Sequence, residues 1–128
     1  MRLQRLDHLV LTVADIDATV AFYERVMGMR AITFGEGRRA LRFGEQKINL
    51  HEVGREFEPR ALRATPGSAD LCFLTNEPVE ALLGELAALE VAVEVGPVTR
   101  SGALGPIRSV YFRDPDGNLI EVAQQLPG

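Results

Sequence analysis

The chain has 128 residues, the size of one domain, since domains usually hold about 100–200 residues. Hydrophobic residues make up 46% and charged residues 25%, which is enough apolar side chain for a buried core. A net charge of −4 and the lack of a basic run exclude a general nucleic-acid binder. The single cysteine, Cys72, cannot form a disulfide within the chain, and no apolar run suits a signal peptide or a membrane span. We therefore expect a cytoplasmic protein.

The first half of the chain reads as a strand, a helix and three more strands. Residues 6–13 alternate between apolar and other side chains with the period of a strand. Asp15 then offers an N-cap, apolar residues follow at helical spacing, and Gly28 suits the helix exit. The three further strands are predicted at 29–34, 39–43 and 46–53, before a polar loop at 54–68.

The same order of elements restarts after this loop. A strand is predicted at 70–75, followed by a helix that Asn76 caps, with Pro78 in its first turn. Strands follow at 92–95, 107–113 and 118–124, with a connection rich in Gly and Pro between the first two. Each half is thus strand, helix, then strands, which indicates an internal duplication of secondary structure, although residue identity between the halves is weak.

A sheet with a helix on only one face needs a cover for its other face, and the second half of the chain is the obvious partner. We therefore predict an α+β fold of two paired βαβββ modules, with the helices outside and a cleft between curved mixed sheets. The chain, 1–128, is a single domain with module one at 1–57, a linking loop at 58–68 and module two at 69–128. The period of 2 predicts these polar residues on the cleft faces: His8, Lys47, Asn49, His51, Asp70 and Glu121.

Imidazole and carboxylate side chains that converge on one concave face have the composition of a divalent-metal site with open positions. Any one of them alone is more often a strand-end polar group that bonds the backbone or water. His51 and Asn49 lie two residues apart on one strand face, so either is a candidate ligand or substrate contact. Glu121 stands among apolar residues, where a carboxylate is costly unless it is paired or binds a metal.

Other features have plainer interpretations. Residues 114–118 (DPDGN) resemble a calcium loop, but the twelfth position is Gln125 instead of glutamate, so we predict a hairpin turn. Cys72 is interpreted as a small core residue, not a nucleophile. Most of the six Phe and two Tyr residues are expected to face the helices. Cations that would suit an anionic substrate, but that are more often plain solvated charge, are Arg39, Arg42, Lys47 and Arg100.

The opening LDHLVLTVADIDATVAFYERVMGM and the closing YFRDPDGNLIEV resemble the signatures of the vicinal oxygen chelate superfamily. This superfamily includes glyoxalase I, fosfomycin-resistance thiol transferases, methylmalonyl-CoA epimerase, extradiol dioxygenases and metal-free bleomycin-binding proteins. The segments ALRFGEQKINLHEVGREFEP, PGSADLCFLT and GPVTRSGALGPIRSVYFRDPDGNLIEV resemble more specifically the glyoxalase domain-containing protein 5 group, whose bacterial members are sometimes labelled virulence-associated glyoxalases. The resemblance covers nearly the whole chain.

The resemblance implies metal ligands from the first and the last strand of each module. The first-strand positions fall on His8 and Asp70, and the last-strand positions fall on Asn49 and Glu121. Asp70 replaces a usual histidine, and Asn49 replaces a glutamate that binds metal and moves protons in glyoxalase I. His51, one step further along the same face, is a candidate to compensate. The predicted metal ligands are His8, Asp70, Glu121 and His51, and the predicted substrate contacts are Asn49, Lys47 and Arg100.

Two functions follow from the resemblance. The first is a divalent-metal-dependent, lactoylglutathione lyase-like enzyme that acts on a small molecule chelating the metal through neighbouring oxygens, by isomerase, lyase or thiol-transfer chemistry. Its catalytic residues would be Glu121 and His51 and its ion one of Mg, Mn, Ni, Zn or Fe, with Asp70 favouring Mg²⁺ or Mn²⁺. The alternative is a metal-free protein of the bleomycin-resistance type that binds or sequesters a small molecule. The retained His8 and Glu121 favour the enzyme. The resemblance also implies a homodimer, in which modules can be exchanged between chains, and no nucleic-acid or membrane partner.

Overall fold

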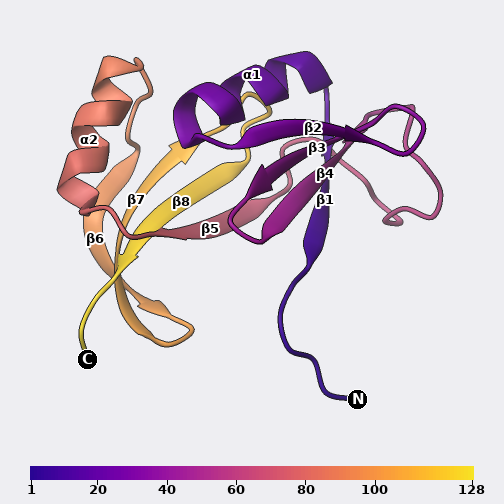
Figure 1. Ribbon diagram of the computed structural model, residues 1–128. Coiled ribbons are helices and arrows are strands. Elements are labelled where there is room, and N and C mark those ends of the chain that lie inside the picture. The colour runs from indigo at the N-terminus through magenta and orange to yellow at the C-terminus, as the bar shows by residue number, and fades with distance from the viewer. The chain divides into compact units, whose positions relative to one another are not determined.

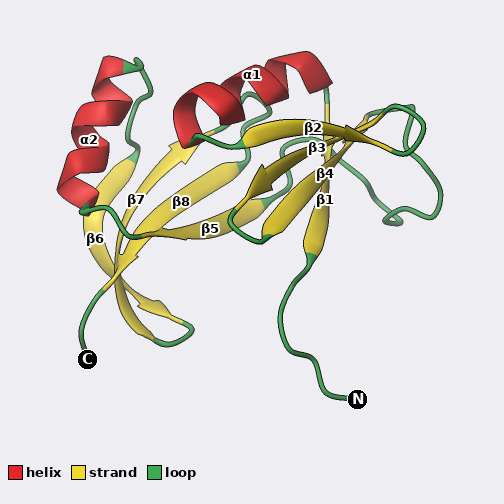
Figure 2. Ribbon diagram, viewed as in Figure 1, coloured by secondary structure: helices red, strands yellow, loops and turns green.

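The computed structural model describes all 128 residues and confirms an α+β fold with two βαβββ modules (Figures 1 and 2). The chain divides into two compact units, Met1–Gly67 and Ser68–Gly128. Each unit holds one helix and one four-stranded sheet. Neither helix is long and apolar enough to cross a membrane.

The first unit follows the predicted order closely. Its sheet has the strand order β1-β4-β3-β2, in which β1 and β4 are parallel and the other neighbours are antiparallel. The parallel pair arises because the helix intervenes between β1 and the other strands, and parallel strands need such a crossover. The elements are β1 (His8–Val13), α1 (Ile16–Met27), β2 (Arg30–Phe34), β3 (Arg38–Phe43) and β4 (Gln46–Glu52).

The second unit repeats this topology. The strand order is β5-β8-β7-β6, again with a parallel pair, β5 and β8, and antiparallel neighbours elsewhere. Figure 1 shows β5 and β8 side by side, as β1 and β4 are in the first unit. The elements are β5 (Asp70–Thr75), α2 (Val79–Ala88), β6 (Val95–Gly102), β7 (Gly105–Arg113) and β8 (Leu119–Gln125).

The prediction of a short strand at 92–95 followed by a long Gly- and Pro-rich connection is wrong. Residues 95–102 form β6, which pairs with β7 as far as the tight turn between Gly102 and Gly105. Gly96 and Pro97 lie where the register shifts between Val95 and Val98. They are tolerated there because β6 is an edge strand, where bulges, Gly and Pro disturb only one ladder.

The helix caps agree with prediction in the first unit and differ in the second. The Asp15 side chain accepts a hydrogen bond from the Ala18 amide at 3.1 Å, and Gly28 ends α1 in the left-handed conformation. The predicted cap by Asn76 is wrong: Pro78 occupies the N-cap position of α2, without a side-chain cap bond. The amide of Val79 donates instead to the Gln124 side chain of β8 at 3.3 Å, which ties the start of α2 to the sheet.

One face of each sheet packs on its helix. In the first unit α1 lies against β2, β3 and β4, and in the second unit α2 lies against β7 and β8. The buried side chains of these faces include Tyr23, Leu41, Ile48 and Leu50, and in the second unit Leu82, Leu86, Val110, Phe112 and Ile120. Because side chains alternate along a strand, the other face of each sheet carries the remaining residues, including His8, Asn49, Asp70 and Glu121.

Candidate functional site

The register of β1 and β4 makes His8 and Asn49 diagonal neighbours. His8 pairs with Lys47 and Val10 pairs with Asn49. Paired residues share a face, and so do residues two apart on one strand, so His8 and Asn49 both lie on the face opposite α1. The first unit therefore presents one imidazole and one amide side chain from neighbouring strands.

Asp7 holds the ring of His8. Nδ1 of His8 and Oδ2 of Asp7 are 2.8 Å apart, and this hydrogen bond holds the pKa of the Asp7 carboxyl below its usual range. A carboxylate can only accept, so Nδ1 donates this hydrogen bond and Nε2 is the ring nitrogen left for other contacts. A carboxylate behind the outer ring nitrogen is the arrangement found in metal-binding histidines. The His8 ring is thus prepared to bind a cation through Nε2.

Two polar atoms on this face have no partner. Oδ1 of Asn49 and Nε2 of His51 are both buried without a hydrogen bond, and His51 is only 3% exposed. An unsatisfied buried polar atom normally costs about 1–3 kcal/mol, so this pair indicates a place for a bound group. Burial and the charge of Arg38 lower the pKa of His51, and the ring is therefore neutral at neutral pH.

His51 lies further along β4 than Asn49 does, and so it is not a diagonal neighbour of His8. His51 pairs with Thr12, two steps beyond the pair that Val10 makes with Asn49. It lies four residues from Lys47, the partner of His8, or roughly 13 Å along the strand. The register therefore favours Asn49 as the neighbour of His8 and leaves His51 further along the same face.

The register of β5 and β8 repeats the arrangement in the second unit. Asp70 pairs with Leu119 and Cys72 pairs with Glu121, so Asp70 and Glu121 are diagonal neighbours opposite α2. This pair matches His8 and Asn49, strand for strand and step for step. The second unit therefore presents two carboxylates where the first presents an imidazole and an amide.

Glu121 is held by residues of β7. The hydroxyl of Ser109, which is fully buried, donates to Oε2 of Glu121 at 2.6 Å. Tyr111 pairs directly with Glu121, and its hydroxyl accepts from Nε of Arg100 at 3.1 Å. Burial raises the pKa of Tyr111, and the bond from Arg100 opposes that rise. The predicted substrate contact Arg100 thus lies in the same network, whereas Ser109 and Tyr111 were not predicted, although the alternation in 107–113 places both on this face.

The interpretation of Cys72 as a core residue is wrong. Its side chain is exposed, because the alternation along β5 puts it with Asp70 on the face opposite α2. Burial in its local surroundings and the neighbouring charge of Glu121 raise the pKa of the thiol to about 11. The thiol therefore stays protonated at neutral pH, as expected for a residue that is not a nucleophile.

The turn before β8 sets the position of Asp70. The side chain of Asp114 accepts from the amides of Asp116 and Asn118, which confirms the predicted hairpin turn. Asn118 is 1% exposed, and its Oδ1 accepts from the amide of Ala69 at 2.8 Å. This bond ties the residue before Asp70 to the β7–β8 turn, and so fixes where β5 begins.

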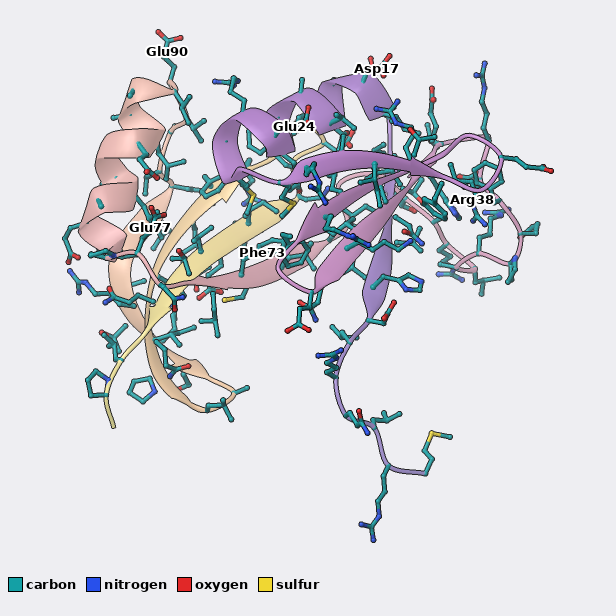
Figure 3. All side chains as sticks on the ribbon, in the orientation of Figure 1. Asp17, Glu24, Arg38, Phe73, Glu77 and Glu90 are labelled. Atoms are coloured by element: carbon teal, nitrogen blue, oxygen red, sulfur yellow. The ribbon has the colours of Figure 1, made fainter.

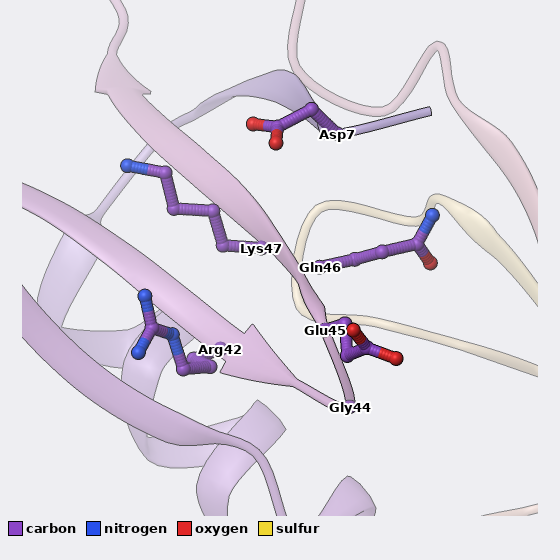
Figure 4. Close-up of a pocket in the computed structure, with 6 residues that line it drawn as sticks. All are labelled: Asp7, Arg42, Gly44, Glu45, Gln46 and Lys47. Atoms are coloured by element: carbon purple, nitrogen blue, oxygen red, sulfur yellow. The ribbon is translucent and has the colours of Figure 1, made fainter. Parts of the chain in front are cut away.

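A polar hollow of about 360 Å³ lies beside His8 (Figure 4). Figure 4 shows the charged ends of Asp7, Arg42 and Lys47 directed to the same side, away from Gln46. The Gln46 side chain donates to the carbonyl of Leu6 at 2.8 Å, which holds the segment before β1 against β4. The complete lining is Asp7, Arg42, Gly44, Glu45, Gln46 and Lys47.

The expectation that most aromatic residues face the helices has three exceptions. Phe34 and Tyr111 lie on the sheet faces opposite the helices, and Phe57, from the loop after β4, contacts His51. Neither unit gathers three or more His, Cys, Asp or Glu side chains that could hold a metal ion. Each unit by itself therefore offers at most a pair of donors.

Two four-stranded mixed sheets, each with a helix on one face and its donor pair on the other, define the glyoxalase-like fold. The model of the Glyoxalase/Bleomycin resistance protein/Dioxygenase superfamily matches residues 5–122. The chain therefore belongs to this superfamily.

Among its relatives is the virulence protein STM3117 of Salmonella typhimurium, 56% identical over 126 residues, which cover 98% of this chain and 88% of that protein. The crystal structure of STM3117 has a TM-score of 0.97, at 55% identity and with 98% and 100% of the two chains covered. The glyoxalase domain-containing protein RDO1 of Mycosarcoma maydis is 51% identical over 96% of this chain and 69% of its own length.

More distant structures show how widely the fold is shared. Lactoylglutathione lyase from Agrobacterium tumefaciens has a TM-score of 0.73 at 25% identity, with 96% and 95% of the chains covered. The fosfomycin resistance protein FosX from Listeria monocytogenes, in complex with Mn(II) and sulfate, has a TM-score of 0.67 at 22% identity, with 98% and 93% covered. One of these two structures is a lyase and the other holds Mn(II), while the more similar relatives carry names without a reaction.

Proposed function

We propose that this protein is a divalent-metal-dependent enzyme that acts on a small molecule through two neighbouring oxygens, by isomerase, lyase or thiol-transfer chemistry. The observation that carries the proposal is the repeated diagonal pair: His8 with Asn49, and Asp70 with Glu121, each opposite a helix. Each unit contributes one such pair of candidate metal donors.

The donors fit a divalent cation. They comprise one imidazole nitrogen, one amide oxygen and two carboxylates, and a set this rich in oxygen favours Mg²⁺ or Mn²⁺. The unpartnered Oδ1 of Asn49 supports its role, in place of His51, as the donor next to His8. When bound, the ion would polarise two neighbouring substrate oxygens and stabilise the negative charge that develops on them.

Neighbouring side chains hold the proposed metal ligands in position through hydrogen bonds. Asp7 orients the His8 ring, and Ser109 orients the Glu121 carboxylate. Such outer contacts commonly change metal affinity by about 10–100-fold when they are removed. Arg100, through the hydroxyl of Tyr111, supplies a donor network next to Glu121.

His51 is the proposed proton acceptor. Its Nε2 has no partner, its ring is neutral, and it lies two residues from Asn49 on the same face. A substrate next to Asn49 would therefore lie within reach of the imidazole, as general base catalysis requires. Glu121 remains a proposed metal ligand, and its carboxylate can also exchange a proton with the substrate.

A metal-free binding protein is the second candidate. In the first unit the ring of Phe34 lies opposite α1 and that of Phe57 lies beside His51, where they can pack on an organic ligand. This arrangement is typical of a site that holds a small molecule by apolar contact. The two candidates differ in whether a divalent ion binds.

The test is a thermal-shift series with Mg²⁺, Mn²⁺, Ni²⁺, Zn²⁺ and Fe²⁺ on protein first stripped with EDTA. An ion that binds only the folded protein stabilises it by about 2.7 kcal/mol at a hundredfold excess over Kd. His8→Ala and Glu121→Ala should each abolish the response, while Glu36→Ala, an exposed turn carboxylate, should keep it. Asn49→Ala should weaken it if the amide is a donor. A full thermal shift in Glu121→Ala would refute the metal site. No thermal shift in the wild type would refute the metal-dependent enzyme and favour the metal-free binding protein.

Three finer proposals accompany this function. The protein belongs with the glyoxalase domain-containing protein 5 group, is a homodimer, and works in the cytoplasm. The match with a glyoxalase domain-containing relative supports the first, and the single cysteine supports the last. Sedimentation equilibrium at micromolar concentration tests the dimer, and a monomer there would contradict it.

A further inference from the structure

The face of the first sheet opposite α1 carries positive charge without acidic residues. The strand pairing places Arg30, Arg38, Arg42 and Lys47 on this face, and it places no aspartate or glutamate there. None of the four forms an ion pair, whereas Arg39, on the other face, is paired with Asp17. Asp7, just before β1, lies beside Arg42 and Lys47, but the four cations outnumber it, and an excess of positive charge attracts anions.

Two of these cations contact the same aromatic ring. Nζ of Lys47 lies 3.8 Å from the centre of the Phe34 ring, and Cζ of Arg38 lies 5.7 Å from it. The Arg38 guanidinium also lies 4.4 Å from the centre of Phe57, and Figure 3 shows Arg38 near the β2–β3 turn. Cation–π contacts restrict both side chains, so the cations are held in position instead of moving freely in water.

A buried polar atom without a partner lies in the same group of side chains. The His51 ring meets Phe57 edge to face, with ring centres 5.7 Å apart, and the charge of Arg38 acts on it. Its side chain is buried and Nε2 has no hydrogen bond. Positive charge, aromatic surface and a hydrogen-bonding atom therefore come together on one part of the sheet.

From this juxtaposition we infer that the substrate is a small organic acid. Its carboxylate or other oxyanion binds between Arg38 and Lys47, its apolar part packs on Phe34 and Phe57, and a hydroxyl group, where the acid carries one, donates to Nε2 of His51. This inference rests on the proposed function, because it names the substrate class for the same sheet face. It requires no metal ion for the anion itself to bind.

A polyanion fits these observations less well. The whole chain has a net charge of −4, which repels nucleic acid, and Arg38 and Lys47 are partly covered and bound to rings. A small anion satisfies the two cations and the imidazole together, and Arg38 can bind an oxyanion with two parallel hydrogen bonds.

The experiment is an NMR titration of isotope-labelled, metal-free protein in EDTA with benzoate and with benzamide, its uncharged isostere. Benzoate should shift the amide signals of β3 and β4 in a saturable way, and benzamide should not. Inorganic phosphate should bind more weakly than benzoate because it lacks the apolar part. Arg38→Gln and Lys47→Gln should each raise the Kd for benzoate about tenfold.

The matched control is Arg63→Gln, which removes an exposed arginine of the loop after β4 and should leave the Kd unchanged. The dispersion of each variant's NMR spectrum shows whether that variant folds. If only one of Arg38→Gln and Lys47→Gln folds, that variant alone is enough for the test. No saturable shift with benzoate, equal binding of benzamide, or an equal loss in Arg63→Gln would overturn the inference. The titration contains no metal ion, so it is independent of the thermal-shift series. Benzoate binding without a metal-induced thermal shift would refute only the proposed metal-dependent enzyme. A metal-induced thermal shift without benzoate binding would refute only the substrate class.

Discussion

Asn118→Ala tests the side-chain network that joins the β7–β8 turn to the start of β5. The buried amide of Asn118 accepts from the Ala69 amide and donates to Oδ2 of Asp114, both at 2.8 Å. Alanine removes both bonds and leaves a backbone donor and a carboxylate oxygen without these partners. It also releases the residue before Asp70, a proposed metal donor.

The expected loss follows from these two bonds. A neutral hydrogen bond contributes about 0.5–1.5 kcal/mol, and one to a charged group about 1.5–3 kcal/mol. We therefore expect Asn118→Ala to lower the free energy of unfolding by about 3 kcal/mol. For a chain of this size that corresponds to a melting temperature lower by roughly 12 °C.

Urea denaturation followed by circular dichroism measures the change. Asn76→Ala is the matched control, because Asn76 is exposed and does not cap α2, and it should change the stability by less than about 0.5 kcal/mol. A loss below about 1 kcal/mol in Asn118→Ala, or an equal loss in the control, would show that the network does not hold β5 in place.

Three further predictions follow. Gly96→Ala should lower the free energy of unfolding by several kcal/mol, because Gly96 has a φ of +112° and an added Cβ would meet the backbone of β7. Gly84→Ala on α2, where space is open, should instead raise it by about 0.5–1 kcal/mol, and thermal unfolding measures both changes. At about pH 8, Cys72 should react with a thiol reagent roughly a hundredfold more slowly than a free cysteine, since its pKa is about 11, and Glu121→Gln should speed the reaction by removing the neighbouring charge. The folded-state pKa of His51 lies below its usual 6.5, so between the two values the unfolded chain binds more protons. The free energy of unfolding should therefore rise with pH through that window and level off above it, and His51→Gln should flatten this slope in urea titrations from about pH 5 upward; an unchanged slope would contradict the assignment.

The repeated topology and the shared face of the candidate residues were predictable from local patterns. The period of a strand has only two faces, so Lys47, Asn49 and His51 had to lie together once residues 46–53 were identified as a strand. Asp15 and the turn at 114–118 were equally recognisable, because caps and turns depend on a few neighbouring residues.

The tertiary structure decided what depends on pairing between distant segments. Sequence alone could not show that β6 continues through Gly96 and Pro97, because only its place at the edge of the sheet makes them tolerable. The contact of Ser109 with Glu121 required the register of β7 against β8, and a shift of one residue would have turned the hydroxyl to the other face. The approach of Phe57 to Arg38 likewise depends on how a loop folds back on the sheet. Local sequence determines which side chains share a face, whereas non-local register and loop packing determine which of them come into contact.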